Sequence, residues 1–235
     1  MPVIDNFDAV LEIQDAEKLR SLSCNGSMHP RIRGLLPEIL DYIHNDGLCM
    51  PVISYEVIKV DTVKSGIFTL HGGKSLYSPL LSHKLARASH LVFGVTTIGN
   101  SISATISRWF AGGMHVKAFV LEEIANAFLF RVSEHLHTQI EEQALRMGLT
   151  ASGPASPGDL EGFDINQQEV VLSLAGADKI GISKTSTHQM DPVHSISVVV
   201  GMGKRLQKWT RADNCNICRA RDKCVHRHSV EEIPA

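Results

Sequence analysis

Residues 90–99 read HLVFGVTTIG, a compact apolar run that ends in a glycine turn. An apolar run of this length, rich in β-branched and aromatic side chains, is typical of a buried strand. The turn Thr97-Ile98-Gly99 passes directly into residues 100–110, which have helical spacing and stop at a pair of glycines. The stretch therefore predicts a central strand followed by a helix. The first N–H groups of that helix would suit an anion or a carboxylate, unless Asn100 or Ser101 caps them.

Three other segments have the pattern of strands. Residues 51–60 alternate Ile53, Tyr55 and Val57 with polar positions, which is the period of a half-buried strand. Residues 66–70 and 195–200 are short apolar runs bounded by turn residues. Together with the central strand, these segments predict a sheet in a mixed α and β fold.

Four further segments have helical spacing: 34–46, 78–88, 115–147 and 167–175. In the second, Ser78 is an N-cap and Pro79 stands at the first helical position. The third is the longest, with an apolar residue at every fourth position from Val116 to Ala144. Unbroken, it would extend about 50 Å, so we expect a kink or a break in it.

A loop and a C-terminal extension complete the expected organisation. Residues 151–158 read ASGPASPG, and small, turn-forming residues between well-patterned elements are typical of a binding loop. No linker separates two folding units, so we expect one domain over residues 1–203. We expect residues 204–235 to form a C-terminal extension that packs on the same domain.

The composition is that of a globular chain, with 235 residues of which 43% are hydrophobic and 20% charged. This length allows one large domain or two small ones. The longest apolar run is far shorter than the ~20 residues of a membrane span. The N-terminus has neither the basic nor the apolar region of a secretory signal. We therefore expect a cytoplasmic protein that does not cross a membrane.

The net charge of −2 hides an uneven distribution. Residues 204–228 hold eight Lys or Arg against two Asp, a net charge of +6, which leaves −8 for the rest of the chain. Trp209 is the only aromatic residue of this segment, so a base-stacking surface for nucleic acid is not expected. The basic segment is better suited to an acidic protein partner.

The same segment holds three of the five cysteines, in the pattern C-x2-C-x5-C. Two cysteines at the first spacing direct both thiolates at one metal ion, and a third nearby closes the site. We therefore expect a site of zinc or an iron–sulfur cluster at Cys215, Cys218 and Cys224, with His226 as the favoured fourth ligand. The other candidates for the fourth position are His228, Cys24, Cys49, a water molecule and a substrate. Three reduced thiols or a redox dithiol are the alternatives to a metal.

Four stretches, in their order along the chain, resemble one protein family. They are the strand and turn at 86–99, the helix at 121–137, the loop Ser156-Pro157-Gly158 with Gly162 and Gln167-Gln168, and MDPVHSIS at 190–197. The family is the activation domain of cobalamin-dependent methionine synthase, which binds S-adenosylmethionine, together with its stand-alone relatives. Some of these relatives carry cysteines near the C-terminus.

The resemblance implies an α+β fold with a twisted, mainly antiparallel sheet and packed helices. It also implies a role in corrinoid-dependent methyl transfer. In that role the protein binds S-adenosylmethionine and docks a corrinoid protein or a corrinoid methyltransferase, so that cobalamin reaches it through this partner. The residues that the resemblance assigns to the cofactor are Thr97, Gly99, Pro157, Gly158, Asp159 and Met190.

Two loop positions depart from the family pattern. Pro154 stands where the family has an arginine, four residues before the loop glycine, and Asp159 stands where a tyrosine follows that glycine. Loss of the arginine removes a bidentate partner for a carboxylate. Aspartate attracts a sulfonium but does not stack on a ring. These departures favour partner docking or metal binding over cofactor binding.

Three hypotheses about function follow. The chain is an activation protein in corrinoid methyl transfer, a metal-dependent methyltransferase that acts on a methyl-corrinoid, or a binding module with a structural zinc or iron–sulfur site. No catalytic residue is assigned, because the sequence has no nucleophile elbow, Walker loop or H-E-x-x-H motif.

Overall fold

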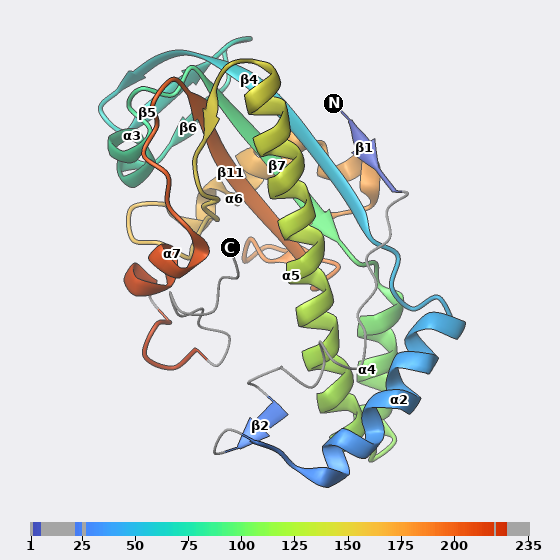
Figure 1. Cartoon of the computed structure of the whole chain (residues 1–235). Helices are drawn as coiled ribbons and strands as arrows, with labels where there is room; N and C mark the ends of the chain where they lie inside the picture. Colours follow the sequence, from blue (N-terminus) through green and yellow to red (C-terminus); the bar gives the residue numbers. More distant parts are fainter. Residues whose placement is uncertain (1, 6–21, 25–26, 219, 225–235) are drawn as a thin grey trace.

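The computed structural model describes residues 2–5, 22–24, 27–218 and 220–224 (Figure 1). These residues form a seven-stranded sheet in the order β6-β5-β4-β7-β11-β8, with β1 paired to β4, and two small two-stranded sheets. The strands of the large sheet are β1 (Val3–Ile4), β4 (Val52–Lys64), β5 (Ile67–Leu70), β6 (Ser75–Tyr77), β7 (His90–Thr97), β8 (Thr150–Ala151) and β11 (Ser195–Gly203). The small sheets pair β2 (Ser23–Cys24) with β3 (Ser27–Met28) and β9 (Ser183–Lys184) with β10 (Met190–Asp191). All these pairings are antiparallel, which confirms the predicted α+β class.

Strand β7 is the centre of the sheet, as its apolar sequence predicts. It pairs with β4 on one side and β11 on the other, and every residue after His90 is buried. Its side chains alternate between two cores, with Phe93 in one and Val92 in the other, because successive residues of a strand point to opposite faces. A Cβ added at Gly94 would lie 2.7 Å from Cδ2 of Leu136. Glycine therefore lets a helix approach the sheet closely at this point.

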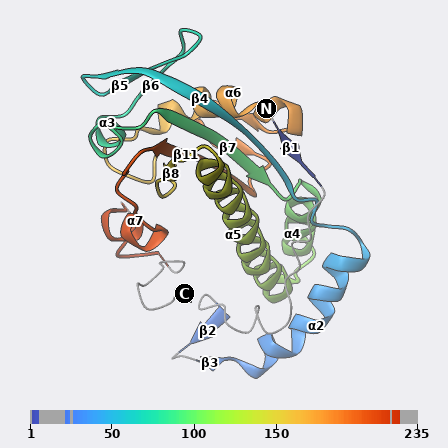
Figure 2. The same ribbon diagram turned by 45° about the horizontal axis from the view of Figure 1, so that its top comes forward.

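Three helices cover one face of the sheet: α2 (Pro30–Asn45), α4 (Ser101–Ala111) and α5 (His115–Arg146). Figure 2 shows α5 lying within the curve of the sheet, with α4 and α2 beside its lower half. The helix α2 begins at Pro30, four residues before the segment that the sequence predicts, because His29 caps it through a hydrogen bond from Arg31 N to Nδ1.

The helix α5 is continuous over 32 residues, so the predicted break is wrong. The predicted apolar stripe is buried from Val120 to Ala144, whereas Val116 at its start is 56% exposed. The stripe drifts around the helix, and successive parts of it meet α4, α2, β7, β8 and β11. Burial against several elements in turn therefore stabilises a continuous helix of about 48 Å.

Smaller elements cover the opposite face. They are α3 (Pro79–Lys84), α6 (Gln168–Ala175) and the 3₁₀ turns η2 (Ile165–Gln167) and η3 (Ala177–Ile180). The short helix α7 (Arg211–Ile217) lies beside the loop that follows β8. The predicted cap of α3 is confirmed, since Ser78 Oγ accepts a hydrogen bond of 3.1 Å from Leu81 N. The helix ends at Lys84 rather than at residue 88. Among the described residues, no helix combines the length and the apolar character that a membrane crossing requires.

Candidate functional site

The glycine- and proline-rich loop at 152–160 is fastened to strand β11. Ala155 and Val199 exchange backbone hydrogen bonds of 3.0 and 2.8 Å, and Ser156 Oγ donates to the Ser197 carbonyl at 2.8 Å. At the start of the loop, Ser152 Oγ accepts from Gly201 N at 2.9 Å. The loop therefore has a defined path, set by bonds to the adjacent strand.

The predicted cofactor residues of this loop lie at its turn. Pro157 is buried, Gly158 is half-buried and Asp159 is exposed. Gly158 has a φ of +87°, which glycine adopts readily and other residues rarely do. Its N–H donates to the Phe163 carbonyl at 2.8 Å, so the turn closes on itself and presents Asp159 at the surface.

The predicted residues Thr97 and Gly99 lie at the end of β7, before α4. Thr97 Oγ1 donates to the His194 carbonyl at 3.1 Å and accepts from Ser195 Oγ and from Gly99 N, both at 3.1 Å. The N–H of Gly99 is therefore already used within the protein. The side chain of Asn100 does not cap α4. The N–H groups in the first turn of that helix therefore receive no acceptor from the Asn100 side chain.

A buried histidine joins the 190–197 stretch to the helical face. His194 is 3% exposed, its Nδ1 lies 2.7 Å from Ser103 Oγ and its Nε2 lies 3.3 Å from Glu122 Oε1. The contact with the His194 ring holds the pKa of Glu122 below its usual value, and a hydrogen bond from Asn126 acts in the same direction. The predicted residue Met190 lies in β10, half-buried against the core that contains Phe93 and Phe163.

The four stretches with family resemblance meet at the first half of β11. Ser195 pairs with Thr97 across the sheet, and Ser197 binds both Ser156, through its carbonyl, and Gln168, through its hydroxyl, at 2.8 and 2.9 Å. The helix α5 reaches the same region through Glu122, whose Oε1 lies 3.3 Å from Nε2 of His194, the residue before β11. Segments far apart in the sequence therefore converge on one strand.

The C-terminal residues 206–218, here called the clamp segment, cover the loop. Trp209 is 8% exposed and its Nε1 donates to the Pro154 carbonyl at 3.3 Å, and Asn214 Nδ2 donates to the same oxygen at 2.6 Å. A Cβ added at Gly153 would lie 2.1 Å from the Trp209 carbonyl oxygen. Further along, Cys218 forms an antiparallel backbone bridge with Leu160. The clamp segment is thus bound at both ends of the loop.

Two of the three predicted cysteine ligands lie in the clamp segment. Cys215 is in α7, Cys218 is its C-cap, and Ala220 N donates to Cys218 Sγ at 3.4 Å, a contact of the kind that stabilises thiolates in metal sites. Cys224 is exposed, and His226 lies outside the described residues. Within the described part of the chain, no three His, Cys, Asp or Glu side chains gather around one point. The described residues therefore do not gather the predicted metal ligands into one site.

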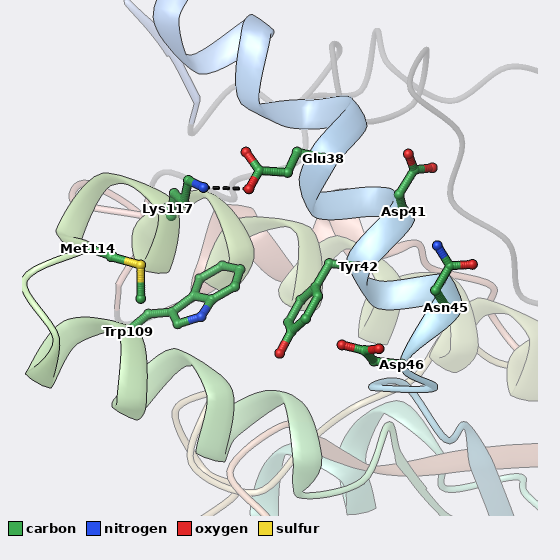
Figure 3. Close-up of a pocket in the computed structure, with 8 residues that line it drawn as sticks. All are labelled: Glu38, Asp41, Tyr42, Asn45, Asp46, Trp109, Met114 and Lys117. Atoms are coloured by element: carbon green, nitrogen blue, oxygen red, sulfur yellow. Dashed lines mark hydrogen bonds and ion pairs between the residues drawn. The ribbon is translucent and has the colours of Figure 1, made fainter.

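A separate pocket of about 450 Å³ lies where α2 meets α4 and the start of α5 (Figure 3). The rings of Tyr42 and Trp109 stack in it with centroids 5.3 Å apart, and Lys117 pairs with Glu38. The remaining residues that line it are Asp41, Asn45, Asp46 and Met114. The sequence did not point to this pocket, because its residues come from two segments about seventy positions apart.

One solved structure similar to this chain is the crystal structure of the MetH reactivation domain bound to AdoHcy. The match has a TM-score of 0.64 and covers 94% of this chain and 85% of that chain, at 14% sequence identity. The chain has the reactivation-domain fold. No family model and no curated protein matches the sequence. The reactivation-domain fold is the one that the order of the four stretches predicted.

The sequence did not point to the clamp segment as a structural partner of the loop. Its helix α7 has only seven residues and shows no usable periodicity. One signal was present, since Thr210 and Asp213 form a capping box in which each side chain accepts the other's backbone N–H. The N–H and the hydroxyl of Thr210 both donate to the Asp213 carboxylate and lower its pKa.

Proposed function

We propose that this protein binds a ligand of the S-adenosylmethionine class at the loop 152–160 and acts as an activation protein in corrinoid-dependent methyl transfer. The observation that carries the proposal is the convergence of the four stretches on β11, in a fold similar to that of a domain crystallised with AdoHcy. The site residues proposed for the ligand are Thr97, Gly99, Pro157, Gly158, Asp159 and Met190.

The loop offers the ligand backbone groups and one carboxylate. Pro154 has no side-chain donor, so the bidentate contact that arginine makes with a carboxylate is absent at this position. The exposed carboxylate of Asp159 attracts a sulfonium cation, and at a separation of about 4 Å in water this attraction amounts to about 1 kcal/mol. We therefore expect S-adenosylmethionine to bind more tightly than AdoHcy, whose sulfur is neutral.

Titration calorimetry with both compounds tests this proposal. We expect S-adenosylmethionine to bind about fivefold more tightly than AdoHcy, and Asp159→Asn to remove that difference while AdoHcy affinity stays the same. Glu161→Gln, two residues further along the loop, is the matched control and should preserve the difference. Absence of binding by both compounds at millimolar concentration would contradict the proposal.

The partner is proposed to be a corrinoid protein or a corrinoid methyltransferase. A docking surface for it is available at the turn between α4 and α5, where Phe110, Met114, Val116 and Phe119 are 41–56% exposed. Exposed apolar side chains gathered in one place are typical of protein interfaces, and the pocket beside them supplies stacked aromatic rings. A partner that docks at this corner would bury these side chains, and that burial favours the complex.

A pair of variants on α5 tests the docking surface against the corrinoid protein of the same organism. Phe119→Ser should weaken binding by about tenfold or more, because a buried aromatic anchor contributes more than 1 kcal/mol. Leu145→Ser changes a side chain that is 74% exposed at the other end of the same helix and should leave binding unchanged. Equal affinities of the two variants for the corrinoid protein would contradict docking at the turn between α4 and α5.

A metal site is proposed at Cys215, Cys218 and Cys224 with His226, for zinc or an iron–sulfur cluster. Cys215 and Cys218 supply the described half of it, and the surrounding basic residues offset the charge of the thiolates. Metal analysis and an absorbance spectrum of anaerobically purified protein test the site. Cys215→Ala should lose the metal, while Cys49→Ala should retain it, and metal-free wild-type protein would contradict the site.

A further inference from the structure

Cys215 and Cys218 lie within the segment that fastens the candidate ligand loop, and both are free thiols in the structure. We propose that, when no metal is bound to these thiols, reversible formation of a disulfide between them loosens residues 157–160 of the loop and thereby lowers ligand affinity. The loosening depends on the contact between the clamp segment and Leu160. The effect on affinity also rests on the function proposed above.

The clamp segment holds the loop at two points, in addition to the bonds of residues 152–156 to β11. The Pro154 carbonyl accepts both Trp209 Nε1 and Asn214 Nδ2, and the backbone of Cys218 pairs with Leu160. Asn214 immediately precedes Cys215, and Cys218 is itself the second point of attachment. A change in the conformation of residues 215–218 therefore acts on the contact with Leu160.

The backbone turn at residues 215–218 brings the two cysteines close to each other. Cys218 N donates to the Cys215 carbonyl at 3.4 Å, which closes a turn over residues 215–218. The Cα atoms at the ends of such a turn are less than about 7 Å apart, and a disulfide spans Cα separations of about 4.4–6.8 Å. Both cysteines are half-buried rather than enclosed, so a small disulfide reagent has access to them.

The chemistry is thiol–disulfide exchange with a low-molecular-weight disulfide such as oxidised glutathione. One cysteine thiolate attacks a glutathione sulfur, forms a mixed disulfide and releases one glutathione thiolate. The second cysteine thiolate then attacks the protein sulfur of that mixed disulfide and releases the other glutathione. The pair of cysteines loses two electrons and two protons, and the reagent is reduced to two glutathione thiols.

A disulfide changes the contacts that Cys218 makes within the clamp segment. Cys218 Sγ accepts the N–H of Ala220 at 3.4 Å, and this residue also carries the backbone bridge to Leu160. A disulfide directs the Cys218 sulfur toward Cys215, so Ala220 loses its acceptor beside the bridge to Leu160. Oxidation therefore weakens the attachment at Leu160 and loosens residues 157–160, while the bonds to β11 still hold residues 152–156.

Hydrogen exchange of the full-length protein tests the proposal, before and after treatment with oxidised glutathione. Mass spectrometry of tryptic peptides confirms the bond, because cleavage after Arg219 separates Cys224 from the peptide that holds Cys215 and Cys218. We expect backbone amides of residues 158–160 to exchange at least about fivefold faster in the oxidised protein, and AdoHcy to bind at least about fivefold more weakly. Cys49→Ala should behave like the wild type, and the double variant C215S/C218S should show no response to the reagent.

Two results would overturn the proposal. One is a complete Cys215–Cys218 disulfide with unchanged exchange at 158–160, and the other is failure of this disulfide to form in excess oxidised glutathione. If AdoHcy binds neither form, the proposed function fails, while the exchange measurement still decides whether the disulfide loosens the loop.

Discussion

Replacing Gly153 with alanine should detach the clamp segment from the candidate ligand loop. The added Cβ would lie 2.1 Å from the Trp209 carbonyl oxygen and 2.5 Å from its Cδ1, where ordinary contact begins at 3.4 Å. The Trp209 backbone must retreat by more than about 1 Å, a distance that hydrogen bonds do not tolerate. Both hydrogen bonds to the Pro154 carbonyl then break, at about 1 kcal/mol each, and part of the Trp209 ring becomes exposed. We expect a total loss of about 3 kcal/mol in the free energy of unfolding.

Urea unfolding and thermal melting measure this loss. For a chain of this size, 3 kcal/mol lowers Tm by roughly 6–12 °C, and trypsin should cleave the variant after Lys208 sooner than the wild type. Gly34→Ala is the matched control, since Gly34 lies in α2 with nothing within 4 Å of an added Cβ. It should raise stability by about 0.5–1 kcal/mol. If Gly153→Ala melts with the wild type and resists trypsin equally, the packing described for Trp209 is wrong.

Three further predictions concern the rest of the molecule. Gly94→Ala should cost about 1–3 kcal/mol in urea unfolding, because its Cβ would lie 2.7 Å from Cδ2 of Leu136 in a packed core; an unchanged midpoint would contradict the close approach of α5. The contact with His194 lowers the pKa of Glu122 from 4.5, so this carboxylate stabilises the fold above that pH, and the contribution is lost as the pH falls through the lower folded value. Glu122→Gln should therefore flatten the dependence of the urea midpoint on pH below about pH 4.5, and an unaltered slope would count against it. Burial raises the pKa of Cys49 to about 12, so iodoacetamide at about pH 8 should label it ~100-fold more slowly in folded than in urea-unfolded protein; equal rates would exclude this environment.

Local sequence pattern predicted the parts of the fold whose burial is periodic or continuous. The run at 90–99 gave the central strand because a strand buried on both faces has apolar residues at nearly every position. The cap at Ser78 followed from short-range chemistry, since the hydroxyl reaches the N–H of Leu81 only three residues away. The length of α5 was misjudged, because its stability comes from packing against several distant elements that its own sequence does not reveal.

The candidate site was predicted only in part, for the same physical reason. The loop glycine and proline residues mark a turn in the sequence, but the partners that fasten the loop are remote. Trp209 binds Pro154 from 55 residues away, and His194 contacts Ser103 across 91 residues. Such contacts depend on tertiary packing, which single-sequence patterns do not encode. The predicted metal ligands were chosen by spacing alone, and the described residues bring together only Cys215 and Cys218 as neighbours in one turn.

The proposed ligand site consists of the loop 152–160 and the adjoining half of β11. Hydrogen exchange of the full-length protein with and without saturating AdoHcy tests this site, because the measurement locates the ligand on the chain. Slower exchange confined to residues 152–160 and to the segments that meet at Ser195 and Ser197 is the result we predict. Protection at the pocket around Trp109, or no protection anywhere on the chain, would contradict it.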